Sequence, residues 1–426
     1  MQNKFGERNF LDSTERIQKQ IDDLAEFNST PGNGVTRVVY TQEDQQAKTY
    51  VKELMNDIGL EITEDAIGNI YGRFKGTDPT LSPIWSGSHL DAVPNGGKFD
   101  GVVGVLGAIE ALRMIKDSGL RPKRDLVAVI FASEEPTRFG IGCLGSRALI
   151  GDLTEKDLKT LKDQGGQSLY DVMRQSGYSP EYLPEVVMHL GEIGAFIELH
   201  IEQGIVLERE RKCIGLIHAI AAPTDIALTL EGEQQHAGAT PMNLRKDPVP
   251  AAAEVILTVE KWAKENTSAH TVATVGRIDV QPGSSNVIAD SVQITIDSRD
   301  VSWENKELFL SELRKTVEHI CTRRGIKYDL KVKAHDKPMQ AHPFVVQKLE
   351  ESCSELMIDY KLMASGAYHD ALMMAKIAPF GMIFVPSKNG ISHDKREWTD
   401  LEYIGEGVKV LTHSLIKLAN TTNFND

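Results

Sequence analysis

The chain has 426 residues, a length that suggests two domains rather than a single core. Its 41% apolar and 25% charged residues are typical of a globular protein and argue against disorder. The formal net charge of −14 argues against binding to nucleic acid or to anionic membrane surfaces, so an anionic substrate would need a local cationic anchor.

Neither a signal core nor a membrane span is indicated. Residues 1–6 are not apolar, and the longest apolar run, 126–132, is far too short to cross a bilayer. The four cysteines lie far apart and indicate reduced thiols, and a small buried residue is the favoured interpretation of Cys143, ahead of a catalytic thiol. We therefore expect a soluble cytoplasmic protein.

The first third of the chain alternates predicted helices and strands. Apolar spacing predicts helices over residues 13–28 and 42–58. Residues 84–89 then form a predicted strand that ends at a histidine, and residues 102–112 a mostly apolar helix. The continuously apolar run at 126–132 fits a strand buried on both faces, as in a sheet covered by helices.

Apolar and polar side chains alternate within residues 195–200, which places Glu198 and His200 on one face of a predicted strand. From about residue 215 the pattern changes to antiparallel strands with one wet face, interrupted by helices. The predicted strands and helices are, in chain order, strand 226–231, helix 250–264, strands 271–280 and 291–296, helix 305–324 and strand 328–333. From residue 343 we expect a helix, a turn at 364–367, a second helix and a strand at 381–385.

This order predicts an α/β protein with one domain inserted into the other. The larger domain, residues 1–214 and 334–426, is predicted to have a helix-covered, mostly parallel sheet. The inserted α+β domain, residues 215–333, has about four antiparallel strands and two helices.

An imidazole and two carboxylates lie within twelve residues in the segment 87–101. His89 ends a predicted strand, and Asp91 is a natural acceptor for its second ring nitrogen. Asp100 follows an Asn-Gly-Gly turn, whose glycines allow a carboxylate into a crowded site. Each pattern alone also fits an ordinary surface pair or turn, and their joint occurrence favours function.

Glu134 and Glu135 follow the buried strand, where exposure to solvent is not expected. Adjacent side chains diverge, so one glutamate can bind metal while the other acts on substrate as a general base. His200 and His393 are isolated histidines that would each more often be packed or surface residues. Together with His89 and with Asp100 as a bridge, such ligands suit a pair of divalent ions such as zinc or manganese, and hence a hydrolase.

These residues together resemble the M20 metallopeptidase superfamily, most closely its amidase and carbamoylase branch. The resemblance covers nearly the whole chain, and the stretch Glu-Leu-His-Ile-Glu-Gln-Gly at 198–204 is the strongest marker of the branch. It implies two divalent ions per subunit, zinc or manganese, with cobalt and nickel as further options. The implied roles are one metal on His89 and His200, the other on Glu135 and His393, a bridge by Asp100, Glu134 as base and then acid, and Asp91 orienting His89.

The resemblance also implies that the inserted domain is a lid that forms a homodimer. His236 would reach the partner's active site and stabilise the oxyanion, while Asn286 would hydrogen-bond the substrate. Arg299 would bind the substrate carboxylate through two hydrogen bonds, although its sequence context alone favours a residue that forms an ion pair at a strand edge. Further residues expected to line the substrate are Gln203, Gly366, Ala367, Tyr368 and His369.

Tyr368 departs from the branch, which often has glycine at this position. The added bulk and hydroxyl either favour a small or hydroxylated ureido acid or only pack against the lid.

We expect an amidohydrolase that cleaves the ureido C–N bond of a carboxylate-bearing N-carbamoyl compound, foremost an N-carbamoyl-L-amino acid. Ureidoglycolate and allantoate are alternative substrates. An aminopeptidase or deacylase is disfavoured by His200, and a silent binding dimer by the complete set of ligands.

Overall fold

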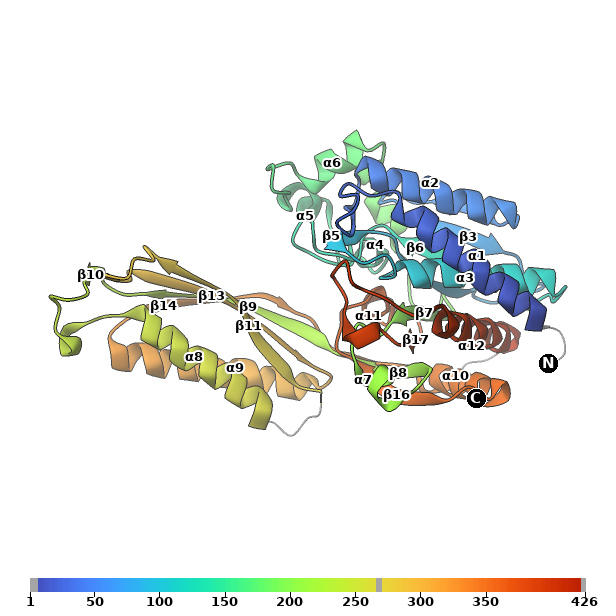
Figure 1. The fold of residues 1–426 in the computed structure, drawn as a ribbon. Helices are drawn as coiled ribbons and strands as arrows, with labels where there is room; N and C mark the ends of the chain where they lie inside the picture. Colours follow the sequence, from blue (N-terminus) through green and yellow to red (C-terminus); the bar gives the residue numbers. More distant parts are fainter. Residues whose placement is uncertain (1–6, 266–269, 423–426) are drawn as a thin grey trace. The chain divides into compact units, whose positions relative to one another are not determined.

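The computed structural model describes residues 7–265 and 270–422 (Figure 1). Within the described residues the chain forms two compact units. Unit 1 comprises residues up to His218 together with Ala341–Met363 and the residues from His369, and unit 2 comprises Ala219–Gln340 and Ala364–Tyr368.

The inserted unit begins and ends later than the sequence-based bounds of 215 and 333. It begins later because the first half of strand β8 (Ile214–Ile220) pairs with strand β17 (Phe380–Val385) in the large sheet of unit 1. Unit 2 also includes the short segment Ala364–Tyr368, which the sequence assigned to the other domain.

Four parallel strands form the centre of the sheet of unit 1, in the spatial order β17–β7–β4–β6. Every residue of these four strands is buried, as predicted for the apolar run at 126–132. On one side β3 pairs antiparallel with β6, and β2 with β3. On the other side β8 pairs antiparallel with β17, and β16 pairs with β8. Their bounds are β2 (Glu61–Glu64), β3 (Ile70–Phe74), β4 (Ile84–His89), β6 (Leu126–Phe131), β7 (Ala195–Ile201) and β16 (Tyr360–Ser365).

Helices cover both faces of this sheet. Ile197 and Leu199 of β7 pack in one core with residues of α3 (Val102–Asp117) and α12 (Leu401–Asn420). His200 points to the opposite face, where its ring lies 4.7 Å from that of His369 at the start of α11 (Asp370–Met374). The helix-covered parallel sheet predicted from the sequence is therefore confirmed.

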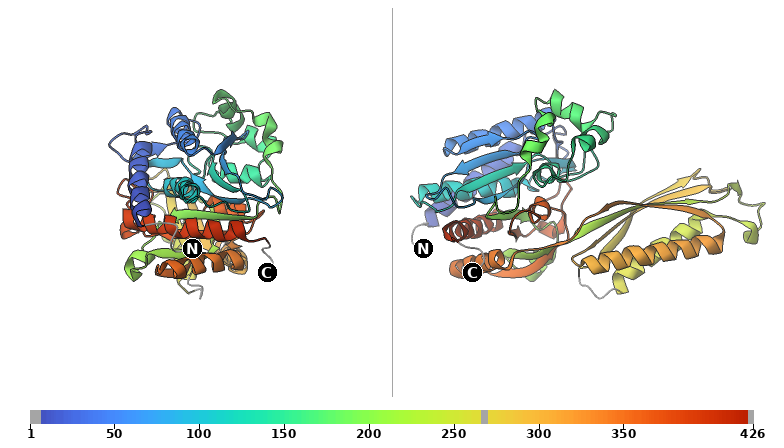
Figure 2. Two further views of the ribbon diagram at one scale, coloured as in Figure 1. Left: turned by 90° about the vertical axis from the view of Figure 1, so that its right-hand side faces the viewer. Right: turned by 180° about the vertical axis from the view of Figure 1, so that it is seen from behind.

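The remaining helices and strands of unit 1 surround this sheet (Figure 1; Figure 2). They are α1 (Glu7–Ala25), β1 (Val35–Arg37), α2 (Gln42–Asp57), β5 (Ala92–Gly96), α4 (Leu144–Leu149), α5 (Glu155–Thr160), α6 (Leu169–Gln175), η1 (Pro180–Val186), α7 (Val206–Glu210), α10 (Pro343–Leu356) and η3 (Lys388–Gly390). None of the described helices has the length and apolar character that a bilayer crossing requires.

Unit 2 is a four-stranded antiparallel sheet with two helices along one face (Figure 1). Its strands lie in the order β11–β13–β9–β14, and alternate residues such as Ile226 and Ile294 form a core with Val255 and Phe309 of the helices. The bounds are β9 (Ala222–Glu231), α8 (Pro248–Glu265), β11 (Val272–Gln281), β13 (Ser291–Asp300), α9 (Trp303–Arg324) and β14 (Lys327–His335), with the short elements β10 (Gln235–His236), η2 (Met242–Leu244), β12 (Val287–Ile288) and β15 (Met339–Gln340).

The turn expected at 364–367 is partly wrong. Ala364 and Ser365 are the last residues of strand β16, which pairs with β8, and only Gly366 and Ala367 lie outside the strand. The sequence Tyr-Lys-Leu-Met-Ala-Ser is half-buried with weak alternation, so a periodicity argument does not detect this strand.

Candidate metal centre

The predicted metal ligands come from the ends of the parallel strands of unit 1. Open α/β sheets place their sites at this carboxyl edge, because the strand ends and the following loops converge there. His89 is the last residue of β4, Glu135 follows β6, His200 is the penultimate residue of β7, His393 follows β17, and Asp100 precedes α3.

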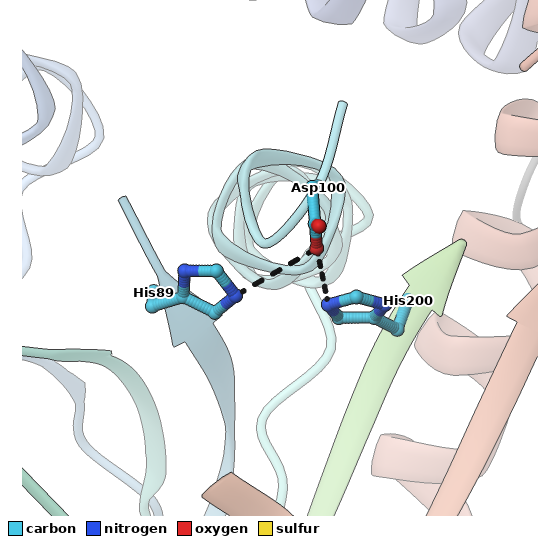
Figure 3. A group of neighbouring side chains, drawn as sticks. All are labelled: His89, Asp100 and His200. Carbon is cyan, nitrogen blue, oxygen red and sulfur yellow. Dashed lines mark ion pairs between the residues drawn. The ribbon is translucent and has the colours of Figure 1, made fainter. Parts of the chain in front are cut away.

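Asp100 lies at the centre of this group, and its two oxygens face different partners. Oδ1 lies 3.1 Å from Nε2 of His200 and 3.8 Å from Nε2 of His89 (Figure 3). Oδ2 lies 3.1 Å from Nε2 of His393, which is in turn 3.2 Å from Oε1 of Glu135. The five side chains thus form two three-residue groups that share Asp100, with ligand atoms in each group within 4.8 Å of one another.

The orientation of the histidines fits metal binding. Nδ1 of His89 lies 3.0 Å from the backbone oxygen of Asp91, and Nδ1 of His200 lies 2.9 Å from that of Ile201. A carbonyl can only accept, so each Nδ1 carries a hydrogen, and once the ring is neutral its Nε2 is the nitrogen with a lone pair for a metal. Imidazole nitrogens and carboxylate oxygens in this number are a donor set for zinc or manganese.

In the absence of a cation, protons balance the charge of this cluster. Burial would lower the pKa of His89 and of His200, but the neighbouring carboxylates of Asp91 and Asp100 outweigh it and raise both. Hydrogen bonds to Asp100 and Glu135 raise the pKa of His393 to about 11. For Asp100, burial opposes ionisation, yet its contacts with His200 and His393 hold its pKa well below the usual range. Divalent ions would therefore replace protons.

Glu134 lies beside this cluster and takes part in neither of the two groups centred on Asp100. Burial and the adjacent Glu135 raise the pKa of its carboxyl group well above the ordinary value. Its Oε1 lies 3.8 Å from Sγ of Cys143. Burial and nearby carboxylates also raise the pKa of the Cys143 thiol, so this cysteine is a buried, protonated residue and not a nucleophile.

Gln203 adjoins the second group. Its Nε2 donates to Oδ2 of Asp100 at 2.9 Å and lies 3.4 Å from Nε2 of His393. Its backbone has a φ of +55°, which is uncommon for glutamine, and its buried Oε1 has no hydrogen-bond partner. An unsatisfied buried acceptor next to the candidate metal ligands is suited to a donor group of a substrate.

A third group of potential ligands consists of Glu198, His200 and His369. Both oxygens of Glu198 already accept hydrogen bonds, at 2.7 Å from the Ser88 hydroxyl and at 3.0 Å from the backbone N–H of Ala371. Glu198 is therefore a structural carboxylate, and His369 stacks edge-on against His200 instead of completing another metal site.

Unit 2 holds the other predicted residues at two opposite ends of its sheet. His236 and Asn286 are joined at one end, where Ala237 N–H donates to the Asn286 carbonyl at 2.9 Å and β10 pairs with β12. Nδ1 of His236 accepts from the backbone N–H groups of Gly238 and Ala239, which leaves Nε2 as the protonated nitrogen of the neutral ring.

Arg299 lies at the far end of the same sheet. The eight steps along β13 from Ser291 to Arg299 span about 27 Å at ~3.4 Å per residue. Nε and Nη2 of Arg299 donate to the carboxylate of Asp297, and Nη1 donates to the Gly366 carbonyl at 3.0 Å. The structure therefore does not bring Arg299 together with His236 within one unit.

The segment Gly366–Tyr368 packs with Arg299. Tyr368 donates its hydroxyl hydrogen to Oδ2 of Asp336 at 2.9 Å, so this hydroxyl is engaged within unit 2. The neighbouring pocket on the open face of the sheet has a volume of about 690 Å³ and is lined in part by Arg299, Asp297 and Gly366.

Two residues of the site were missed by sequence reasoning. Ser133 donates to Oδ2 of Asp91 at 2.9 Å, and the carboxylate of Glu397 accepts from the backbone N–H of Asp100 at 3.1 Å. Ser133 adjoins the glutamate pair and could have been noticed there. Glu397 lies 297 positions from Asp100, and its position shortly after His393 is the only local signal.

Comparison with known proteins agrees with this geometry. The profile of the family described as "Peptidase family M20/M25/M40" matches residues 85–417, well over half of the chain. This chain belongs to the M20 family. Members of this family are metal-dependent, in agreement with the clustered histidines and carboxylates.

Relatives that are similar over nearly the whole chain include a ureidoglycolate hydrolase, an N-carbamoyl-L-amino-acid amidohydrolase and an allantoate amidohydrolase. A ureidoglycolate hydrolase of Oryza sativa subsp. japonica is 43% identical over 97% of this chain and 86% of that protein. An N-carbamoyl-L-amino-acid amidohydrolase of Pseudomonas sp. (strain NS671) is 38% identical over 95% of this chain and 98% of that protein.

A solved structure, that of AtUAH in complex with (S)-hydroxyglycine, superimposes with a TM-score of 0.86. It is 43% identical, and the match covers 96% of this chain and 98% of that chain. The resemblance inferred from the motifs around His89 and His200 is thereby confirmed.

Proposed function

We propose that the protein is a binuclear metal-dependent amidohydrolase that cleaves the ureido C–N bond of a carboxylate-bearing N-carbamoyl compound. The observation that carries this proposal is the position of Asp100, whose two oxygens face two separate sets of ligands. One ion would be held by His89 and His200 and the other by Glu135 and His393, with Asp100 shared between them. Zinc and manganese suit this donor set best.

When bound, such a pair of ions lowers the pKa of a water molecule and polarises the carbonyl that it attacks. Glu134 is the group that moves the proton. Its raised pKa allows it to hold the proton taken from water and then to deliver it to the leaving nitrogen. Water adds to the ureido carbon, the C–N bond breaks, and the products are an amine and carbamic acid, which decomposes to ammonia and carbon dioxide.

Among ureido acids, we propose ureidoglycolate as the first substrate. Identity is higher to the ureidoglycolate hydrolases, at 43% and 44%, than to the carbamoyl-amino-acid enzyme, at 38%. Removal of the carbamoyl group from ureidoglycolate leaves hydroxyglycine, the compound with which the similar AtUAH structure was solved. An N-carbamoyl-L-amino acid is the second candidate, supported by a relative that aligns over 98% of its length.

We further propose that the enzyme acts as a homodimer in which unit 2 is the lid. A small ureido acid is several times shorter than the strand that separates His236 from Arg299, so one subunit cannot apply both residues to one substrate. Arg299 would bind the substrate carboxylate in its own subunit, and His236 with Asn286 would serve the partner's site. The Nε2–H of His236 is a donor suited to a developing oxyanion.

The substrate is tested by ammonia release from a panel of compounds with the zinc- or manganese-loaded protein. The panel contains ureidoglycolate, N-carbamoylglycine, longer N-carbamoyl-L-amino acids, allantoate, N-carbamoyl-β-alanine and a dipeptide. We expect ureidoglycolate to have the highest kcat/KM, and its close analogue N-carbamoylglycine, which lacks only the hydroxyl, to be turned over more slowly. Preference for the dipeptide would refute the amidohydrolase proposal.

Glu134→Gln tests the proton carrier. This variant should bind metal like the wild type and lose turnover by about 10²–10⁴-fold, because the amide cannot take a proton. Equal turnover of the variant and the wild type would exclude Glu134 as the base.

Mixing two inactive variants tests the dimer. In a heterodimer of Glu134→Gln and His236→Ala subunits, one site keeps its own Glu134 and receives an intact His236 from the partner. Mixed subunits should therefore regain activity that neither homodimer has. Absence of recovery, with heterodimers demonstrated by differently tagged subunits, would show that His236 does not act across the dimer.

A further inference from the structure

Glu397 joins the two loops of unit 1 that carry Asp100 and His393. Its Oε1 accepts hydrogen bonds from the backbone N–H groups of Phe99 at 3.0 Å and Asp100 at 3.1 Å. Its Oε2 accepts from the hydroxyl of Ser392 at 2.8 Å. One carboxylate thus links residues about 300 positions apart in the sequence.

The fit around this carboxylate is close. Glu397 is only 4% exposed, and a Cβ atom added at Gly97 would overlap its carboxylate. Glycine at this position therefore lets the Asn-Gly-Gly turn pass directly over Glu397. Because two successive backbone N–H groups donate to one oxygen, they constrain the orientation of the Asp100 peptide independently of the contacts of its side chain.

The partners of Glu397 are not those of a simple stabilising ion pair. In the part of the chain that the structure describes, no lysine or arginine forms an ion pair with it, and its three hydrogen bonds come from the two ligand loops. A buried carboxylate without a cation costs folding free energy, so its presence calls for another role.

Ser392 extends the link to the second group of ligands. Its hydroxyl lies 2.8 Å from Glu397 and 3.4 Å from Oδ2 of Asp100, the oxygen that faces His393. His393 itself has a φ of +56°, a conformation that a non-glycine residue keeps only when its surroundings hold it. The contacts of Ser392 with Glu397 and Asp100 hold this loop immediately before the histidine.

We propose that Glu397 is a positioning residue that locks the Asp100 backbone to the His393 loop and so sets the geometry of the site formed by Asp100, Glu135 and His393. This inference rests on the proposed metal-dependent function. Glu397 touches neither substrate nor metal, and it acts through the two ligands that it aligns.

Zinc binding to the variants tests this inference. In a competition titration with a chromophoric chelator, Glu397→Ala should bind the ion at Asp100, Glu135 and His393 about 10–100-fold more weakly. The ion at His89 and His200, which shares only Asp100, should be weakened less. The zinc affinity of Glu397→Gln should lie between those of the wild type and Glu397→Ala, because the amide oxygen can still accept from Phe99 and Asp100. Ser392→Ala should weaken the binding of the first of these two ions to a smaller extent.

Glu110→Gln is the matched control. Glu110 is also a buried glutamate of unit 1, 1% exposed, but it pairs with Arg16 and lies well inside α3. This variant should lower the Tm of the metal-free protein and leave both zinc affinities unchanged. Weakening of zinc binding equal to that in Glu397→Ala would overturn the positioning role.

The remaining outcomes separate this inference from the proposed function. If Glu397→Ala only lowers the Tm of the metal-free protein and binds two zinc ions like the wild type, the positioning role is wrong and the metal site stands. If the wild type itself binds no divalent ion, the proposed function fails and this inference fails with it.

Discussion

Asp91 accepts a hydrogen bond from the backbone N–H of Glu134 at 3.0 Å. Its second oxygen accepts from the N–H of Glu135 at 3.1 Å, and its first lies 3.3 Å from Nδ1 of His89. The sequence predicted only the contact with His89. In the structure, one buried carboxylate orients His89, a predicted ligand at the end of β4, and also the two glutamates that follow β6.

Asp91→Asn should therefore disturb the two glutamates after β6 as well as His89. The amide retains one acceptor oxygen but turns its NH₂ toward a backbone N–H, so we expect a loss of about 1–3 kcal/mol in unfolding free energy and a 10–100-fold weaker affinity for zinc. Asp65→Asn is the control, because Asp65 likewise accepts from backbone N–H groups, three instead of two, but contacts no predicted ligand. Equal zinc affinities in the two variants would contradict the role of Asp91.

Metal binding should release protons. The pKa of His393 is raised to about 11, and those of His89 and His200 are also raised, so the metal-free site is protonated near neutral pH. A bound ion needs neutral imidazole, and the proton therefore competes with the metal. Zinc affinity should rise from pH 6 to pH 8 by about tenfold per pH unit for each proton released. Calorimetry in two buffers of different ionisation enthalpy counts these protons, and a buffer-independent enthalpy would refute the prediction.

Arg299→Lys should weaken the binding of substrates that carry a carboxylate. Asp297 holds the guanidinium on two nitrogens, and the lysine ammonium cannot reproduce this planar arrangement. We expect kcat/KM for ureidoglycolate to fall about 10–100-fold, and Asp297→Asn to cause a smaller loss in the same direction. Measurement with the corresponding neutral amide is the control. An equal loss on that amide would show that Arg299 does not bind the carboxylate.

Tyr368→Phe should leave substrate preference nearly unchanged. The tyrosine hydroxyl donates its hydrogen to Asp336 and is therefore committed to unit 2. We expect the ratio of kcat/KM for ureidoglycolate to that for N-carbamoylglycine to change by less than about twofold, with a loss of about 1 kcal/mol in stability. A large fall in this ratio would instead assign the hydroxyl to substrate recognition.

Lys306 provides a pH dependence of stability in unit 2. Its ammonium donates to the carbonyl of Pro223 at 2.7 Å and to the hydroxyl of Thr224 at 2.8 Å, and burial lowers its pKa from 10.5 to about 8. Above pH 8 the folded protein therefore binds fewer protons here than the unfolded chain, so stability rises with pH up to about 10.5.

Comparison with Lys306→Met isolates this contribution from those of other groups. The unfolding free energy of the wild type, relative to that of the variant, should rise by on the order of 1–3 kcal/mol between pH 7 and pH 10. Chemical denaturation at each pH measures this difference. Parallel curves for the two proteins would contradict the lowered pKa.

Many helices and strands could be predicted because apolar residues recur along the sequence with the spacing of the buried face of a helix or strand. The strand at 84–89 has the predicted bounds, and the apolar run that begins at Leu126 forms β6 almost as expected. The strand β16 was not predicted, because its half-buried residues alternate weakly. The bounds of the inserted unit were displaced because pairing of β8 with β17, and not composition, decides where unit 1 ends.

The amino-acid sequence by itself determined which chemical groups are present and which strand ends deliver them, since periodicity and motif spacing are local properties. Only the tertiary structure decided that Asp100 directs its two oxygens to different histidines and that Glu397 binds the Asp100 backbone. The physical reason is the strand order β17–β7–β4–β6, which brings loops hundreds of residues apart to one edge of the sheet. No local pattern encodes that order, because it follows from the packing of the whole chain.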